Sequence, residues 1–275
     1  MKSKSSRQLL QYLAVTFGWT WFFWIVAALT GKQADSFSVI LLMALGGLGP
    51  AGSAILLTLR DRDISQRHDF WQRLVDFRRI RPVWYLIIFL TVPLTSLLAV
   101  WTRTLLTAES YSFEQALTLL SRPLSLLPLI FTVLFFGPLP EEPGWRGYAL
   151  DRLLFHWNAV TSSLILAIVW ATWHIPLFFI KGTYQQEIGF GTPGVWLYMA
   201  GLIPETILMT WIFNNTRRST LSAILFHFMI NFTGHFLVPA QGFAVYRLAW
   251  AGMIALIIIL IFGRNLSKNG ASRDS

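Results

Sequence analysis

Long apolar runs alternate with short polar segments along most of the chain. An α-helix needs about 20 apolar residues to cross the roughly 30 Å hydrocarbon core of a bilayer, and eight of these runs are near that length. They cover residues 9–29, 37–59, 83–101, 124–150, 160–180, 195–213, 221–238 and 248–262. The pattern therefore predicts an all-α fold, a polytopic transmembrane helical bundle of about eight spans.

The segment of residues 60–81 differs from the spans, because arginines alternate in it with apolar side chains at roughly helical spacing. Such a pattern predicts one amphipathic helix that lies at the membrane interface. No polar stretch is long enough to form a soluble domain. We therefore expect residues 1–265 to form a single transmembrane domain, followed by a polar cytoplasmic tail at residues 266–275.

Composition supports a membrane protein, since 55% of the residues are hydrophobic and only 13% are charged. The formal net charge is +9, but Lys and Arg stand in short clusters beside the apolar runs. This arrangement is typical of topology signals and of contacts with lipid headgroups, so we predict the lipid bilayer as a partner and no nucleic acid. The absence of cysteine excludes disulfides, thiolate catalysis and cysteine-bound metal.

Basic residues are unevenly distributed among the loops. The N-terminus, the 60–81 segment, the end of the fourth run, the loop before the seventh run and the C-terminal tail carry most of them. By the positive-inside rule these parts face the cytoplasm, and an even number of spans also puts both termini on one side. The sequence thus predicts a multi-pass protein of the cell membrane with both termini cytoplasmic.

One stretch places charge inside an apolar run: Pro140-Glu141-Glu142-Pro143-Gly144-Trp145-Arg146-Gly147. A single charge near the bilayer centre costs at least about 2.5–3.5 kcal/mol, so three charges in six residues indicate a water-accessible cavity. Glu142 and Arg146 have the spacing and order of a favourable helical ion pair, which leaves Glu141 facing another direction. The two prolines predict a broken helix, tolerated at membrane depth only where it lines protein or a cavity.

Other spans also contain polar residues at a similar depth. At 1.5 Å per helical residue, Glu141 and His227 lie about 15 Å and 14 Å from the predicted cytoplasmic edge, and His174 about 14–20 Å. Asn231 follows His227 by four residues and therefore projects from the same helix face. A lone buried His or Asn often serves only to hydrogen-bond two helices. Because three helices bring these groups to one depth, a functional site is favoured. Glu205, in the sixth run, is not assigned a definite role.

These residues form three motifs, Glu141-Glu142-x-x-x-Arg146, Trp170-x-x-x-His174 and His227-x-x-x-Asn231. Together they resemble the signature of the CAAX prenyl protease and bacteriocin-processing (CPBP, Abi) family of intramembrane endopeptidases, bacterial type. The resemblance covers about residues 124–238, and Trp170 stands where family members often carry Phe. It implies an enzyme that hydrolyses a peptide bond in a membrane-associated peptide or protein substrate.

The resemblance also suggests roles for the catalytic residues. Peptide hydrolysis requires an activated water, donors for the oxyanion and a proton for the leaving amine. Glu141 and His174 are expected to activate water, and His227 and Asn231 to stabilise the oxyanion, while Arg146 supports the motif by pairing with Glu142. The same four catalytic residues can also be read as metal ligands, since two His and one Glu form the set of a catalytic zinc. The cofactor stays open between none and Zn, with the metal-independent glutamate mechanism favoured.

Two non-enzymatic alternatives remain: an immunity-type membrane protein that binds a peptide toxin, and a proton-coupled transporter with a relay through Glu141, His174 and Glu205. Transporters usually show two halves with matching broken helices. This sequence has a single such segment, at residues 138–144, which favours one hydrolytic site.

Overall fold

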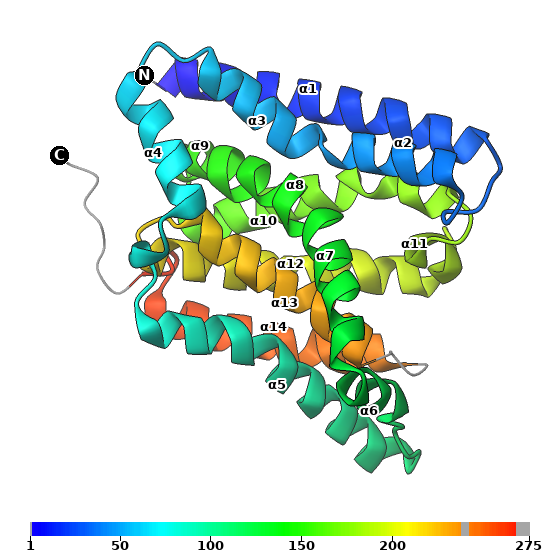
Figure 1. Ribbon diagram of the computed structural model, residues 1–275. Coiled ribbons are helices and arrows are strands. Elements are labelled where there is room, and N and C mark those ends of the chain that lie inside the picture. The colour runs from blue at the N-terminus through cyan, green and yellow to red at the C-terminus, as the bar shows by residue number, and fades with distance from the viewer. Residues whose placement is uncertain (1, 238–241, 268–275) are drawn as a thin grey trace.

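The computed structural model describes residues 2–237 and 242–267, and this part of the chain folds into an all-α bundle, as predicted (Figure 1). The helices are α1 (Lys2–Leu29), α2 (Phe37–Gly47), α3 (Gly49–Leu59), α4 (Ile64–Val75), α5 (Pro82–Thr107), α6 (Glu114–Ser121), α7 (Leu126–Phe135), α8 (Pro138–Gly144), α9 (Leu150–His156), α10 (Ala159–Trp173), α11 (Tyr184–Ile188), α12 (Pro193–Asn215), α13 (Thr220–Phe236) and α14 (Phe243–Phe262). A π-helical turn, Trp145–Ala149, joins α8 to α9, and short 3₁₀ turns lie at Phe77–Arg79, Pro123–Ser125 and Ile175–Phe179.

Seven helical segments within the described residues are long and apolar enough to cross a membrane. They are Ser5–Leu29, Phe37–Leu59, Pro82–Thr107, Pro123–His156, Ala159–Phe179, Pro193–Asn215 and Phe243–Phe262. The remaining predicted span corresponds to α13, which has 17 residues and a length of about 25 Å. The predicted end of that span, Val238, and the tail beyond Ser267 lie outside the described residues. The chain is thus a multi-pass helical membrane protein.

Two large apolar clusters hold most of the bundle together, and a small third one joins α5 to α14. The first joins α1, α3, α10 and the π-helical turn through large side chains that include Tyr12, Trp145 and Trp173. The second joins α5, α12, α13 and α14. The charged motif lies between these clusters, because α8 packs against α3 on one side and against α13 on the other.

The segment predicted to be amphipathic forms α4, and Asp63 caps its N-terminus by accepting hydrogen bonds from the backbone N–H groups of Ser65 and Gln66. Phe70 is buried in the first apolar cluster, while the polar residues Ser65, Gln66 and Gln72 are exposed. The helix is therefore amphipathic, as predicted, and its inner face packs on α3, α13 and the π-helical turn.

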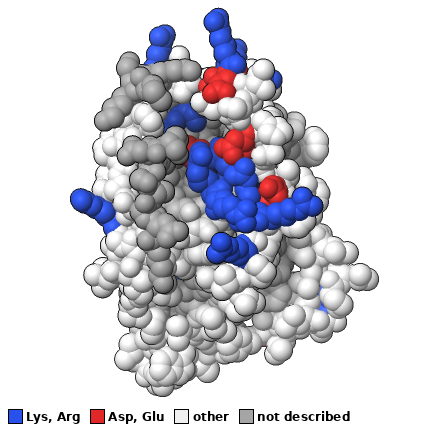
Figure 2. All heavy atoms as spheres, turned by 90° about the vertical axis from the view of Figure 1, so that its left-hand side faces the viewer, with Lys and Arg blue, Asp and Glu red and all other residues white. Residues whose placement is uncertain are grey.

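Basic side chains gather at one end of the bundle, where the N-terminus and α4 lie (Figures 1 and 2). The loops that the sequence assigned to one side of the membrane thus meet at one end, which we call the basic end. The α1–α2 loop and α11 lie at the opposite end (Figure 1).

Candidate active site

The fourth predicted span is broken where the sequence indicated. The helical path stops at Gly137, whose backbone has φ −140° and ψ −98°, and Pro138 opens the seven-residue helix α8. Proline is suited to this first turn because its missing N–H would have no helical partner there. After α8 the backbone widens into the π-helical turn Trp145–Ala149, a form of helix that is rare and occurs frequently at functional sites.

Close backbone contacts fix the position of α8. A Cβ atom on Gly144 would lie 2.5 Å from both the carbonyl carbon and the oxygen of Pro50 in α3. A Cβ atom on Gly137 would lie 2.6 Å from Nδ2 of Asn231 in α13. Glycine is thus required at position 144, where the backbone of α3 leaves no room for a side chain, whereas a side chain at position 137 would displace the amide of Asn231.

The predicted ion pair of the first motif is present. Arg146 Nη1 donates to both oxygens of Glu142, at 2.8 and 3.0 Å, and both side chains are 0% exposed. Nδ1 of His227, from α13, lies 2.7 Å from Glu142 Oε1. Because a carboxylate accepts hydrogen bonds, Nδ1 is the donor and Nε2 of His227 is left for another partner. Glu142 therefore joins α13 to the π-helical turn.

Glu141 has a different set of contacts from its neighbour. Trp170 Nε1, on α10, donates to Glu141 Oε2 at 2.7 Å, and Oε1 accepts no hydrogen bond from the described residues. The backbone carbonyl of Trp170 lies 2.8 Å from Nδ1 of His174, so that this nitrogen donates and Nε2 carries the free lone pair when the ring is neutral. Glu141 and His174 thus each keep one atom available to a water or a substrate.

Trp170 is the common neighbour of all these groups. The Arg146 guanidinium lies over its ring at 4.7 Å, and the imidazoles of His174 and His227 lie at 5.7 and 5.2 Å from its centroid. The sequence named Trp170 only as an aromatic member of the second motif. Its four-residue spacing before His174 was the available signal, since that spacing puts both residues on one helix face.

The four residues predicted to be catalytic come from three helices. Glu141 is hydrogen-bonded to Trp170, and the imidazoles of His174 and His227 both lie beside the ring of that tryptophan. Asn231 lies one helical turn after His227 and is partly exposed, with its amide directed at Gly137. The charged motif is otherwise nearly sealed from solvent.

The residues do not assemble into a metal site. Within residues 2–237 and 242–267, no three His, Asp or Glu side chains converge to hold a metal ion. Nδ1 of His227 is hydrogen-bonded to Glu142, and Oε2 of Glu141 accepts a hydrogen bond from the indole of Trp170. These contacts leave Nε2 of both histidines and Oε1 of Glu141 without a hydrogen bond from the described residues, so the donor atoms of the predicted zinc set are present but do not converge. The reaction proposed below has no step through a metal.

Glu205 lies apart from the motif. Its carboxylate forms an ion pair with Arg247 of α14, beside a void of about 20 Å³ that is also lined by Thr95 and Ser96 of α5. Among the described residues, no hydrogen bond links it to Glu141 or His174. The relay imagined for a transporter therefore has no direct connection here.

The fold and the site define a multi-pass helical membrane protein with a cluster of ionisable groups buried between its spans. Residues 123–233 match the family model of type II CAAX prenyl endopeptidases, Rce1-like. The chain is also 28% identical over 253 residues to CAAX prenyl protease 2 of Methanococcus maripaludis, a match that covers 90% of this chain and 92% of that protein. The chain is thus similar to type II CAAX prenyl endopeptidases of the Rce1-like kind, which confirms the resemblance inferred from the motifs.

Proposed function

We propose that the protein is an intramembrane endopeptidase that hydrolyses a peptide bond in a membrane-associated peptide or protein. The observation that carries this proposal is the unequal use of two adjacent carboxylates. Glu142 is fully engaged by Arg146 and His227, whereas Oε1 of Glu141 accepts no hydrogen bond from the described residues, and Trp170 joins Glu141 to His174. A buried carboxylate with one free oxygen is suited to act as a general base.

In the proposed reaction, Oε1 of Glu141 and Nε2 of His174 both accept hydrogen bonds from the attacking water. Glu141 takes one proton as the water oxygen bonds to the peptide carbonyl carbon. The resulting oxyanion receives hydrogen bonds from Nδ2 of Asn231 and from Nε2 of a protonated His227, whose Nδ1 remains bonded to Glu142. When the C–N bond breaks, Glu141 returns the proton to the leaving amine, which restores its starting state.

Arg146 and Trp170 are positioning residues in this proposal. Arg146 pairs with Glu142, the carboxylate that orients His227. Trp170 holds Glu141 through its indole N–H and fixes the tautomer of His174 through its carbonyl. Both residues act on the catalytic groups and are given no contact with the reacting atoms.

Because the family and its relative are named for CAAX prenyl substrates, the first substrate to test is a farnesylated peptide that ends in Cys-a-a-X. The full chain in lipid vesicles is given an internally quenched form of this peptide, with the unprenylated peptide as a comparison. The Glu141→Gln variant is expected to lose about 10²–10⁴-fold in kcat, the usual contribution of a general base. Glu187→Gln makes the same change at an exposed position on α11 and serves as the matched control.

Retention of the wild-type rate in a folded Glu141→Gln protein would contradict the catalytic assignment. Cleavage of the unprenylated peptide at an equal rate would support endopeptidase activity but show that the prenyl group is not needed for substrate recognition.

We also propose that the basic end, with both termini, faces the cytoplasm, because its concentration of Lys and Arg satisfies the positive-inside rule.

A further inference from the structure

A second cavity lies at the basic end, outside the proposed active site. It has a volume of about 500 Å³ and lies between the start of α1, the end of α3, α4 and the π-helical turn. Among the residues that line it are Gln8, Asp61, Arg67, Tyr148 and Arg152, and none of the four predicted catalytic residues does so. Three membrane spans begin or end beside it, so the cavity lies at the level of the lipid headgroups.

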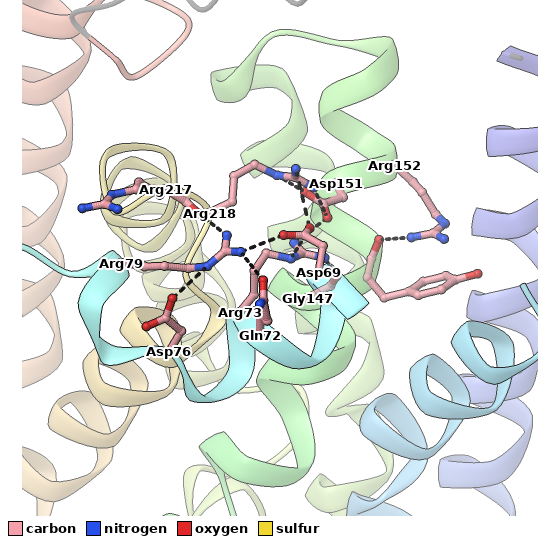
Figure 3. Close-up of polar contacts among 11 residues, drawn as sticks. Asp69, Gln72, Arg73, Asp76, Arg79, Gly147, Asp151, Arg152, Arg217 and Arg218 are labelled. Carbon is pink, nitrogen blue, oxygen red and sulfur yellow. Dashed lines mark hydrogen bonds and ion pairs between the residues drawn. The ribbon is translucent and has the colours of Figure 1, made fainter. Parts of the chain in front are cut away.

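Two of the acidic residues that line this cavity are already neutralised (Figure 3). Asp151 accepts hydrogen bonds from Arg73 and Arg218, each at 2.6 Å. Asp69 contacts Arg73 at 3.0 Å and Arg79 at 2.9 Å. Two carboxylates thus hold three guanidiniums, and the attraction of Asp151 raises the pKa of Arg218 above its ordinary value. These carboxylates are therefore offset by cations and do not oppose the entry of an anion.

Arg152 has no carboxylate within ion-pair distance among the described residues. Its Nη1 donates to the carbonyl of Tyr148 at 2.9 Å, and its guanidinium lies 3.3 Å from the ring centroid of the same tyrosine. Its Nε is buried and has no hydrogen-bond partner. A guanidinium carries five N–H donors, so most of the donors of Arg152 are unused in a cavity large enough for a ligand.

The rim of the cavity supplies further donors. Arg67, on α4, also forms no ion pair with a described residue, and Ser65 and Gln66 line the same side. The remaining acid is Asp61, which accepts a hydrogen bond from Gln8 at 3.3 Å. Four arginines and three aspartates line the cavity, which leaves it with a positive balance.

We propose that this cavity binds the phosphate group of an anionic lipid headgroup, held by Arg152 and Arg67. Guanidinium donors match phosphate oxygens in bidentate geometry, and basic pockets between spans at the cytoplasmic surface bind such headgroups. The volume favours a headgroup over a bare phosphate, since a water molecule occupies about 30 Å³ and the space is many times larger. Gly147 and Tyr148 line the cavity, so an occupant contacts the π-helical turn that carries Arg146.

The test measures ligand-induced thermal stabilisation of the full chain in a neutral detergent. The ligands are short-chain phosphatidylglycerol, short-chain phosphatidylcholine and inorganic phosphate, titrated separately against the wild type and three variants. Arg152→Gln and Arg67→Gln remove cavity donors, whereas Arg62→Gln removes an exposed arginine from the same end without touching the cavity. A ligand that binds only the folded state stabilises it by RT ln(1 + [L]/Kd), so the rise of Tm with ligand concentration gives the apparent Kd.

Phosphatidylglycerol is expected to raise the Tm of the wild type and of Arg62→Gln with the same apparent Kd, and to bind each cavity variant at least tenfold more weakly. A rise in Tm with inorganic phosphate that is lost in the same two variants would assign the site to free phosphate instead of a lipid. An equal response in all variants, or no response in the wild type, overturns the proposal. Because Arg67 lies at the rim, its variant keeps the test valid if Arg152→Gln fails to fold.

Discussion

Gly144 offers the sharpest test of how the fold positions the proposed catalytic carboxylate. An added Cβ atom would lie 2.5 Å from the carbonyl carbon and oxygen of Pro50, and it would also meet the hydroxyl of Tyr12. The tyrosine can turn away, but the backbone of α3 cannot. Since carbon atoms pack at about 3.5–4.0 Å, the Gly144→Ala change must displace α8 from α3 by roughly 1 Å.

This displacement acts directly on Glu141 and Glu142, because both lie on α8. A misplacement of about 1 Å can lower a catalytic rate by about 10²-fold. Overpacking a well-packed contact also costs about 1–3 kcal/mol, which the better helix propensity of alanine offsets by up to about 1 kcal/mol. We therefore expect kcat/KM to fall by about two orders of magnitude, with a smaller loss of thermal stability.

Gly147→Ala is the matched control, because it makes the same change three residues later in the same segment. Its Cβ atom would meet Phe70 Cε2 and Thr220 Oγ1 at 3.4 Å, which is ordinary van der Waals contact. Both variants are assayed for cleavage of the farnesylated peptide in vesicles and for thermal unfolding in detergent. If Gly144→Ala and Gly147→Ala behave alike, the contact with Pro50 does not set the position of α8 and the reasoning fails.

Three further predictions address the site and the topology. Arg146→Gln should lower the free energy of unfolding by about 3–5 kcal/mol, because the buried carboxylate of Glu142 loses its partner. Unchanged stability with lost activity would make Arg146 a catalytic residue instead. Trp170→Phe keeps an aromatic ring but removes the N–H bonded to Glu141, so kcat should fall about tenfold with little change in Tm, and an unchanged kcat would show that this bond is dispensable. Ser65 and Ser112 lie at opposite ends of the bundle and are each replaced by a single cysteine. An impermeant thiol reagent should label the cysteine at position 65 in inside-out vesicles and the cysteine at position 112 in intact cells. The reverse pattern would overturn the proposed orientation.

Features governed by local geometry could be predicted from the sequence. The Glu142–Arg146 pair follows from four-residue helical spacing, and the break before α8 follows from proline and glycine. The apolar runs located the spans because the bilayer sets their length. The similarity to CAAX prenyl endopeptidases was recognised from three short motifs and their order along the chain.

Features governed by packing between distant segments could not be predicted. The sequence indicated surface arginines on the 60–81 segment, yet Arg73 is only 4% exposed. It is buried because Nη2 donates to the carbonyl of Gly147 at 3.0 Å and Nη1 donates to Asp151 (Figure 3). Likewise, the partner of the Trp170 indole depends on how α10 faces α8, and the spacing of residues along one helix carries no such information.

The position of Glu141 must therefore come from tertiary contacts. Helices α8 and α9 have seven residues each, whereas an isolated helix in water needs about 12–15 residues to be even marginally stable. The segment is held by α3 against Gly144, by α13 against Gly137, and by Arg73 on the π-helical turn. Glycine is needed in such a segment because these neighbours approach its backbone directly. The same contacts free the segment from regular helical geometry, so its two adjacent carboxylates can face different partners.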